Sequence, residues 1–183
     1  MWEPTPPYCK EDTRKEHITA AKLVDVFSPN HLELLAFFED SKSAHDTSDF
    51  DPRAIEACAD AFIDSGIGPS GKGTIVVRAG EHGCLVSSST IEGRHRWLPA
   101  FCTDASAVVD ATGGGNTFLG AFTFAMAACN KDAVCAAEMA NVAASFSLEQ
   151  IGTPKLQQNP GQREKWNNSE FEERYQLYQS KLQ

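Results

Sequence analysis

The segment from Asp110 to Asn116 carries residues whose types and order suit the binding of a phosphate group. Its sequence is Asp-Ala-Thr-Gly-Gly-Gly-Asn, followed by apolar and small residues. Glycines let a backbone approach a ligand closely and adopt positive φ angles. The free N–H groups at a helix start attract anions. This glycine segment (residues 110–116) therefore predicts a main-chain anion site, although a flexible turn before a buried helix is the alternative.

A strand and two helices are expected to position the glycine segment. Residues 107–110 (Ala-Val-Val-Asp) predict a short strand before it, and an apolar helix should run from about Asn116 to Cys129. Residues 130–132 break that helix. A second, Ala-rich helix is expected over 133–149, and the Gly-Thr-Pro sequence at 152–154 ends it.

The rest of the chain alternates predicted strands and helices, which indicates the α/β class. Asn30 is placed to cap one helix and Pro52 to begin another. We expect irregular structure over 1–9, helices over 10–22, 31–39, 52–65 and 169–182, loops over 40–50 and 66–73, and strands over 24–27, 74–78, 84–88 and 95–101. The helix over 169–182 lies in a polar tail, 157–183.

Length and charge limit the classes of function. The 183 residues suffice for a single domain over 1–183, and the 42% hydrophobic content is that of a globular protein. The net charge of −9 argues against binding to nucleic acids or anionic membranes, because both repel an acidic chain. The N-terminus lacks the apolar core of a signal peptide, and no apolar run is long enough to span a bilayer. We therefore expect a cytoplasmic protein.

Six cysteines are spread along the chain without a metal-binding pattern. None forms Cys-x-x-Cys, and no Cys/His spacing suggests zinc. Several lie in apolar stretches, where a cysteine acts as a small hydrophobic residue. We expect free thiols in a reducing compartment, without disulfides.

Four motifs, in the same order, resemble the PfkB-type (ribokinase-like) carbohydrate kinases. The glycine segment is similar to the family's Asp-Thr-x-Gly-Ala-Gly-Asp motif, which precedes a helix rich in Phe, Gly and Ala. Residues 28–33 resemble its Asn-x-x-Glu segment, 74–84 its strand with Gly-x-x-Gly, and 141–145 with Gly152 its late nucleotide-site helix and loop. The resemblance covers roughly 22–155. The Trp2-Glu3-Pro4 start and the Gly-Gly-Gly-Asn variant resemble a fungal subgroup.

This resemblance implies a fold and an activity. The fold would be the C-terminal, nucleotide-binding portion of a ribokinase-like, Rossmann-type three-layer α/β fold, with the N-terminal strands and lid absent. The activity would be ATP-dependent phosphoryl transfer to a sugar-like hydroxyl. The implied cofactors are ATP, Mg²⁺ and a monovalent cation. The implied partners are a nucleotide and a small sugar-like substrate, and a homo-oligomer is left open.

The resemblance also gives the glycine segment its roles. Gly113, Gly114 and Gly115 would form the anion hole that stabilises charge on the transferring phosphoryl group. Asp110 would fix the turn or a cation. Asn116 stands where the family has the aspartate that takes a proton from the sugar hydroxyl. A neutral amide cannot act as that base, and losing a base typically costs about 10²–10⁴ in rate.

Other implied site residues have plain structural alternatives. Asn30 and Glu33 would hold Mg²⁺ through water, or Glu33 is a solvated helix carboxylate. Gly80 and Gly83 would pass near the nucleotide phosphates or ribose, or form only a hairpin turn. A last pair, Asn141 and Ser145, lies one helical turn apart and would line the adenine pocket, or it reflects packing of small residues.

Three functional hypotheses remain open from the sequence. The chain is the C-terminal part of an active kinase, a catalytically weak nucleotide-binding regulatory protein, or a truncated remnant. Nothing in it resembles the family's N-terminal half, which carries most of the sugar site. A sheet without those strands would expose an apolar edge, so we expect poor solubility or partner-dependent folding.

Three further motifs are given structural interpretations. Residues 66–73 nearly match a phosphate-binding P-loop but lack its hydroxyl and precede a strand. The basic cluster at 94–96 suits a hairpin turn, and the glycosylation triplet at 167–169 is interpreted as chance. Aromatic residues of the tail should pack the last helix onto the domain; they are Trp166, Phe171, Tyr175 and Tyr178.

Overall fold

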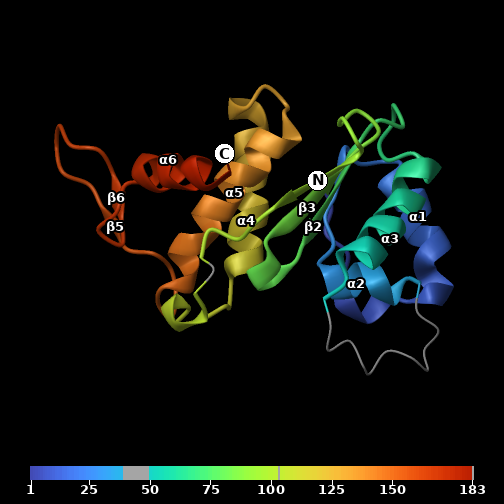
Figure 1. The fold of residues 1–183 in the computed structure, drawn as a ribbon, viewed down its shortest axis with the longest axis horizontal. Helices are drawn as coiled ribbons and strands as arrows, with labels where there is room; N and C mark the ends of the chain where they lie inside the picture. Colours follow the sequence, from blue (N-terminus) through green and yellow to red (C-terminus); the bar gives the residue numbers. More distant parts are fainter. Residues whose placement is uncertain (39–49, 103, 183) are drawn as a thin grey trace. The chain divides into compact units, whose positions relative to one another are not determined.

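The computed structural model describes residues 1–38, 50–102 and 104–182, which form two compact units (Figure 1). The sheet unit comprises 1–79 and 84–97, and the helical unit comprises 80–83 and the chain from Leu98 onward. The α/β class is confirmed. The prediction of one domain over 1–183 stays a prediction.

The sheet unit is built on a four-stranded mixed sheet. Its strands are β1 (Val26–Phe27), β2 (Thr74–Arg78), β3 (Cys84–Ser87) and β4 (His95–Leu98), in that spatial order. β1 runs parallel to β2, with Phe27 beside Ile75, and β3 is antiparallel to β2. Trp2 extends the sheet beside β1, because its N–H bonds Val26 O at 2.8 Å and its carbonyl accepts from Ser28 N at 2.8 Å.

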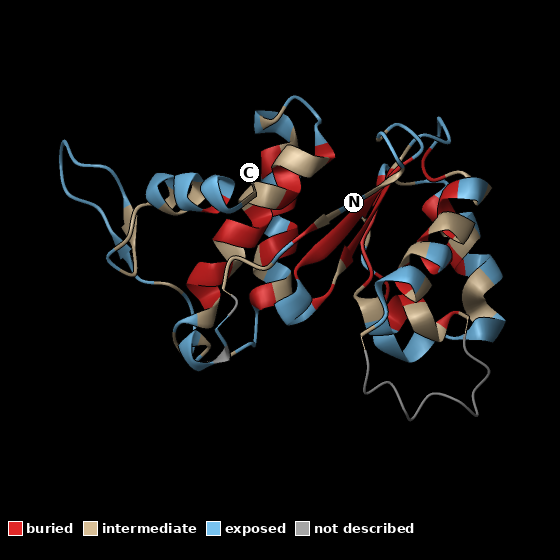
Figure 2. Ribbon diagram, in the orientation of Figure 1, coloured by how far each residue is buried: buried red, intermediate tan, exposed pale blue. Residues whose placement is uncertain are grey.

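Three helices, α1 (Arg14–Ala21), α2 (His31–Ala36) and α3 (Pro52–Ser65), cover one face of this sheet (Figure 1). Short 3₁₀ turns, η1 (Pro6–Tyr8) and η2 (Glu11–Thr13), precede them. Local residues set the bounds of α3, because Asp51 accepts hydrogen bonds from Arg53 N and Ala54 N, and Gly66 ends the helix at φ 84°. The unit's core is apolar and well buried (Figure 2), and it includes Phe27, Leu34, Ile55, Phe62 and Ile75.

The helical unit consists of α4 (Gly114–Ala128), α5 (Ala133–Leu148) and α6 (Phe171–Leu182), with a two-stranded hairpin before α6. The hairpin strands are β5 (Leu156–Gln157) and β6 (Lys165–Trp166), and two 3₁₀ turns are η3 (Gly80–His82) and η4 (Ala105–Ala107). A tight turn joins α4 to α5, with Asn130 at φ 50° and Lys131 at φ 66°. The hairpin has no counterpart among the sequence predictions.

Helix α6 lies beside α5 (Figure 1), and aromatic residues pack the two helices together. Tyr178 is fully buried and packs with Val142 and Phe146 of α5. Its hydroxyl donates to Pro99 O at 2.6 Å and accepts from Asn141 Nδ2 at 3.0 Å. The prediction that tail aromatics pack the last helix onto the domain is therefore confirmed.

The strand predicted over 107–110 is wrong. Residues 105–107 form η4, and residues 108–110 are irregular. The backbone N–H groups of Val109 and Asp110 both donate to Leu148 O, at 2.7 and 3.3 Å. These groups therefore pair with the end of a helix instead of a neighbouring strand.

The prediction of a chain without disulfides is also wrong, because Cys129 and Cys135 form one. The turn between α4 and α5 brings their Cα atoms to 6.0 Å, within the range that a disulfide spans. Of the remaining cysteines, Cys9, Cys58 and Cys84 are buried thiols, as expected from their apolar surroundings.

Two further predictions concern the ends of elements. The helix expected over 31–39 ends at Ala36, and its predicted last residue and most of the 40–50 loop lie outside the described residues.

None of the helices in the described part of the chain has the length and hydropathy needed to cross a membrane.

Candidate functional site

The first turn of α4 presents backbone N–H groups that have no intrahelical acceptor. Gly113 precedes the helix at φ 86°, and no side chain caps it. Gly114 N donates to Ala111 O at 3.2 Å and Thr117 N to Gly113 O at 2.8 Å. Within the described residues, no acceptor is recorded for the N–H groups of Gly115 and Asn116. An anion placed at this helix start would therefore meet two available donors and the positive end of the helix dipole.

The glycines at this start are required for different reasons. A Cβ at Gly113 would meet no atom within 4 Å, so only its positive φ favours glycine there. A Cβ at Gly114 would lie 2.9 Å from Leu148 Cδ2, so Gly114 allows α4 to pack closely on α5. Asn116 is exposed at the first turn. The turn is thus open to solvent in front of Gly113 and closed by α5 behind Gly114.

Asp110 fixes the chain just before this turn. Its Oδ1 accepts from Thr112 N at 2.8 Å. This backbone hydrogen bond, together with the Thr112 hydroxyl, holds the pKa of Asp110 below its ordinary value. The carboxylate is therefore ionised at neutral pH, and its charge suits the turn-fixing and cation-binding roles expected of it.

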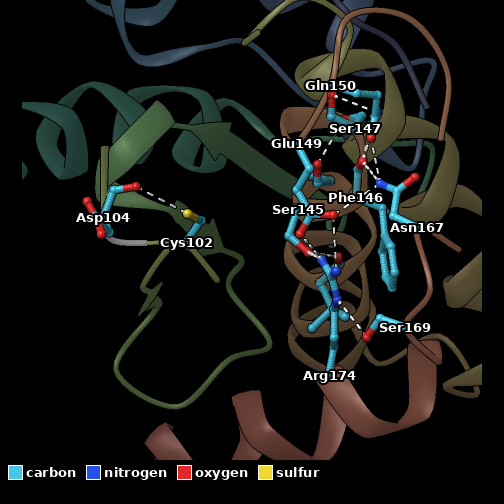
Figure 3. Close-up of polar contacts among 12 residues, drawn as sticks. Cys102, Asp104, Ser145, Phe146, Ser147, Glu149, Gln150, Asn167, Ser169 and Arg174 are labelled. Atoms are coloured by element: carbon cyan, nitrogen blue, oxygen red, sulfur yellow. Dashed lines mark hydrogen bonds and ion pairs between the residues drawn. The ribbon is translucent and has the colours of Figure 1, made fainter. Parts of the chain in front are cut away.

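A pocket of about 270 Å³ lies within the helical unit. Its wall is formed by the last turn of α5 (Ser145, Leu148, Glu149), by Lys181 of α6, and by residues 101, 102, 104 and 107 of the preceding loop. In this wall, Cys102 Sγ donates to Asp104 O at 3.4 Å (Figure 3). Phe101 offers a ring, and Lys181 Nζ lies 5.2 Å from its centroid.

The structure separates the two residues expected at the adenine pocket. Ser145 lines the pocket. Asn141 is buried, with its amide donating to Tyr178, and it is not among the pocket residues. Asn141 thus has a structural partner inside the helical unit, and its role in an adenine pocket stays a prediction.

A polar network at the end of α5 was not anticipated from the sequence (Figure 3). Arg174 of α6 forms a two-pronged ion pair with Glu149, at 2.7 and 3.1 Å, and donates to Ser145 Oγ at 3.0 Å. Asn167 donates from Nδ2 to Phe146 O at 2.9 Å. The only sequence pattern at Asn167 was the glycosylation triplet, and these bonds occupy the nitrogen that a glycan would need.

The Gly80–Gly83 turn contains one glycine that packing demands. Gly83 is buried at φ 86°, and an added Cβ would overlap Leu98 O. Gly80 is exposed at φ 57°, with open space around its Cα. A structural reason thus accounts for Gly83, while Gly80 is free to approach a ligand, and the predicted contact with a nucleotide stays a prediction.

Asn30 and Glu33, in the sheet unit, form a capping box at the start of α2. Asn30 Oδ1 accepts from Glu33 N at 2.8 Å, and Glu33 Oε2 accepts from Asn30 N at 2.7 Å. Glu33 is buried, with the guanidinium of Arg78 at 3.8 Å. Burial raises the pKa of Glu33, while the Asn30 N–H and Arg78 oppose that rise.

These contacts replace the solvated carboxylate that was the alternative for Glu33. Among the described residues, no group of three or more His, Cys, Asp or Glu side chains is arranged to hold a metal ion. A water-mediated Mg²⁺ ion needs fewer direct ligands, so the magnesium role stays a prediction.

Comparison with known proteins identifies the family. The model of the pfkB family of carbohydrate kinases matches residues 5–159. An uncharacterised protein of Schizosaccharomyces pombe is 30% identical over 97% of this chain and 50% of its own length. Protein MAK32 of Saccharomyces cerevisiae is 30% identical over 98% of this chain and 48% of its own length. The chain thus spans about half the length of these fungal relatives.

Solved structures show the same fold. Arabidopsis thaliana ribokinase, complexed with ribose and ATP, matches 74% of this chain with 38% of its own, at TM-score 0.56 and 24% identity. Escherichia coli phosphofructokinase-2, in complex with substrates and products, matches 93% of this chain with 45% of its own, at TM-score 0.61 and 16% identity. The fold is therefore a partial ribokinase-like α/β fold, and the chain belongs to the pfkB family of carbohydrate kinases.

Proposed function

We propose that this chain binds ATP with Mg²⁺ as the nucleotide-binding portion of a carbohydrate kinase, which transfers a phosphoryl group to a sugar-like hydroxyl. The observation that carries this proposal is the open first turn of α4, where Gly113 replaces a capping side chain. The free N–H groups of that turn would stabilise negative charge on the transferring phosphoryl group, which supplies much of the catalysis in phosphoryl transfer.

The pocket in the helical unit would take the base of the nucleotide. Its volume, about 270 Å³, is slightly below the roughly 300–1,000 Å³ of sites that enclose whole ligands. It offers the ring of Phe101 for stacking. The Ser145 hydroxyl already donates to Val142 O at 2.6 Å and accepts from Arg174, so it could only accept one further hydrogen bond from the base. A base in the pocket would leave the phosphates outside it, where backbone donors can bind them.

The proposed reaction also requires cations. Mg²⁺ would be held through water by Glu33 and Asn30, in addition to their bonds within the capping box. Asp110 provides a further carboxylate, and the monovalent cation would be bound mainly by backbone oxygens. A cytoplasmic location, where ATP is abundant, is part of the same proposal.

Asn116 favours a second candidate function, a nucleotide-binding protein with weak or no kinase activity. Its amide occupies the position of the family's base and cannot accept the proton of an attacking hydroxyl. Some turnover is still expected without a base, because the transition state of phosphoryl transfer is loose and is stabilised mainly by electrostatics, which the backbone donors of α4 can supply. The two candidates share the nucleotide site and differ only in chemistry.

Calorimetric titration of the chain with Mg-ATP, and separately with adenosine, tests the shared site. We expect saturable binding of both, with Mg-ATP binding more tightly because only it reaches the α4 amides. A folded chain that binds neither ligand would refute the proposal. Equal affinities for Mg-ATP and adenosine would contradict the proposed anion site and support only the base pocket.

An Asn116→Asp variant then separates the two candidates. If Asn116 limits an otherwise competent kinase, the aspartate should raise phosphoryl transfer to a panel of sugars by about 10²–10⁴. Asn116→Ala is the matched control, because it also removes the amide but supplies no base. No gain in the aspartate variant, with unchanged Mg-ATP affinity, would favour the nucleotide-binding protein.

A further inference from the structure

We propose that Arg174 of α6 is a positioning residue for the nucleotide site, acting through the last turn of α5. The proposal rests on the proposed function for its ligand. Arg174 is not among the residues that line the pocket, nor does it belong to the glycine segment. Arg174 is linked to both through the end of α5. This end forms part of the pocket wall, and its Leu148 carbonyl binds the start of the glycine segment.

The guanidinium of Arg174 fixes two residues of the pocket wall. It binds both carboxylate oxygens of Glu149 and donates to Ser145 Oγ. It also lies 3.8 Å from the centroid of the Phe146 ring, which supports its plane (Figure 3). Only 13% of this side chain is exposed, so the contacts form largely away from water. The planar fork of arginine matches this set of acceptors, and lysine does not.

Asn167 completes the same arrangement from the segment before α6. The final carbonyls of a helix have no intrahelical donor, and Asn167 Nδ2 supplies one to Phe146 O. The same nitrogen lies 3.0 Å from Glu149 Oε2 and 2.6 Å from Gln150 Oε1. The last turn of α5 is therefore held by the tail on two sides of Glu149.

Leu148 connects the last turn of α5 to the glycine segment. Its carbonyl accepts from the N–H groups of Val109 and Asp110, and its side chain packs where a Cβ of Gly114 would be. One residue thus contacts both the entry to the segment and the first residue of α4. Because Glu149 follows Leu148 directly, releasing Glu149 frees the carbonyl that fixes Asp110.

Amide hydrogen exchange tests this link without any nucleotide. We expect Arg174→Met, which keeps an apolar side chain over Phe146, to speed exchange at Val109 and Asp110 at least tenfold. Arg174→Lys, which keeps the charge, should give a smaller increase and serves if the methionine variant does not fold. Arg163→Met is the matched control, because Arg163 is exposed and pairs only loosely with Glu170 at 3.8 Å.

The same variants are titrated with Mg-ATP and with adenosine below their melting temperatures. We expect Arg174→Met to weaken Mg-ATP binding about tenfold and adenosine binding less, with Arg163→Met unchanged. Unchanged exchange at Val109 and Asp110, or faster exchange with unchanged affinity, would overturn the proposal and leave Arg174 a purely structural residue. If the wild-type chain binds no nucleotide, the proposed function fails, and the exchange experiment still decides whether Arg174 positions the segment.

Discussion

Helices α2 and α4 begin in opposite ways. At the start of α2, Asn30 and Glu33 supply side chains to each other's backbone N–H groups. At the start of α4, Gly113 supplies none. The side chains at the start of α2 accept hydrogen bonds from backbone N–H groups there, whereas α4 leaves such N–H groups for solvent or a ligand. A helix start composed of glycine is therefore better evidence for an anion site than one whose polar side chains already bind the backbone.

The carboxylates near these two helix starts also differ, because their pKa values are shifted in opposite directions. Glu33 is buried, and burial raises its pKa. Asp110 lies before an open turn, and hydrogen bonds from Thr112 lower its pKa. Glu33 belongs to the interior of the sheet unit, whereas Asp110 is held charged beside the turn where the anion site is proposed.

The largest effect is expected from a negative charge at the start of α4, which tests whether this helix start differs from that of α2 in binding an anion. A Gly113→Asp variant would place a carboxylate where the phosphates are proposed to bind, and there is room for it. We expect Mg-ATP affinity to fall at least about 100-fold, roughly 2.7 kcal/mol. Gly113→Asn is the matched control, since asparagine has nearly the same shape and must adopt the same positive φ, but carries no charge. Equal losses in both variants, measured by calorimetry, would mean that the backbone and not the anion site was disturbed.

A smaller effect is expected from opening the start of α2. Asn30→Ala removes a cap and should lower stability by about 0.5–2 kcal/mol, which corresponds to a melting temperature lower by roughly 1–8 °C. Asn30→Asp keeps a capping oxygen and should retain most of the stability. Thermal unfolding followed by circular dichroism measures both. If Asn30→Ala instead leaves stability intact and weakens Mg-ATP binding, the magnesium role outweighs the capping role.

The smallest expected effect is in the pH dependence of stability. The folded state holds the proton of Glu33 more tightly than the unfolded state, so this contribution is present below about pH 4.5 and is lost as pH rises through the folded pKa. Asp110 acts in the opposite direction, because its contribution is present above about pH 3.8 and is lost on acidification.

Urea unfolding between pH 3 and 7 compares the two carboxylates. Glu33→Gln should reduce the loss of stability above pH 4.5, and Asp110→Asn should reduce the loss at the acid end. Matching pH profiles for the two variants would contradict the difference between the two helix starts.

Local signals made much of the fold predictable. Asn30 marks a helix start through its capping side chain, and Pro52 and Gly66 mark helix ends through their backbone conformations; the structure begins or ends helices beside each of them. Alternating strands and helices also predicted the α/β class. Such features require only neighbours along the chain, so a single sequence contains them.

Most of the features that the sequence did not predict depend on contacts between segments far apart in the chain, and the disulfide depends on a local turn. Val109 resembles a strand residue, yet its N–H pairs with Leu148 at the end of a helix. Arg174 and Asn167 act on α5 from the tail, and neither has a spacing that points there. The disulfide depends on the turn between α4 and α5, which sets the separation of Cys129 and Cys135.

Gly83 and Gly113 share a φ of 86° but should have different evolutionary histories. At position 83 an added Cβ would overlap Leu98 O, so every relative with this turn should keep glycine, whether or not it still binds a ligand. At position 113 there is open space, and asparagine or aspartate tolerates the same φ. If Gly113 serves the proposed anion site, lineages that do not bind nucleotide should vary at position 113 while position 83 stays fixed. Substitution at 113 would then record whether selection maintains the proposed site.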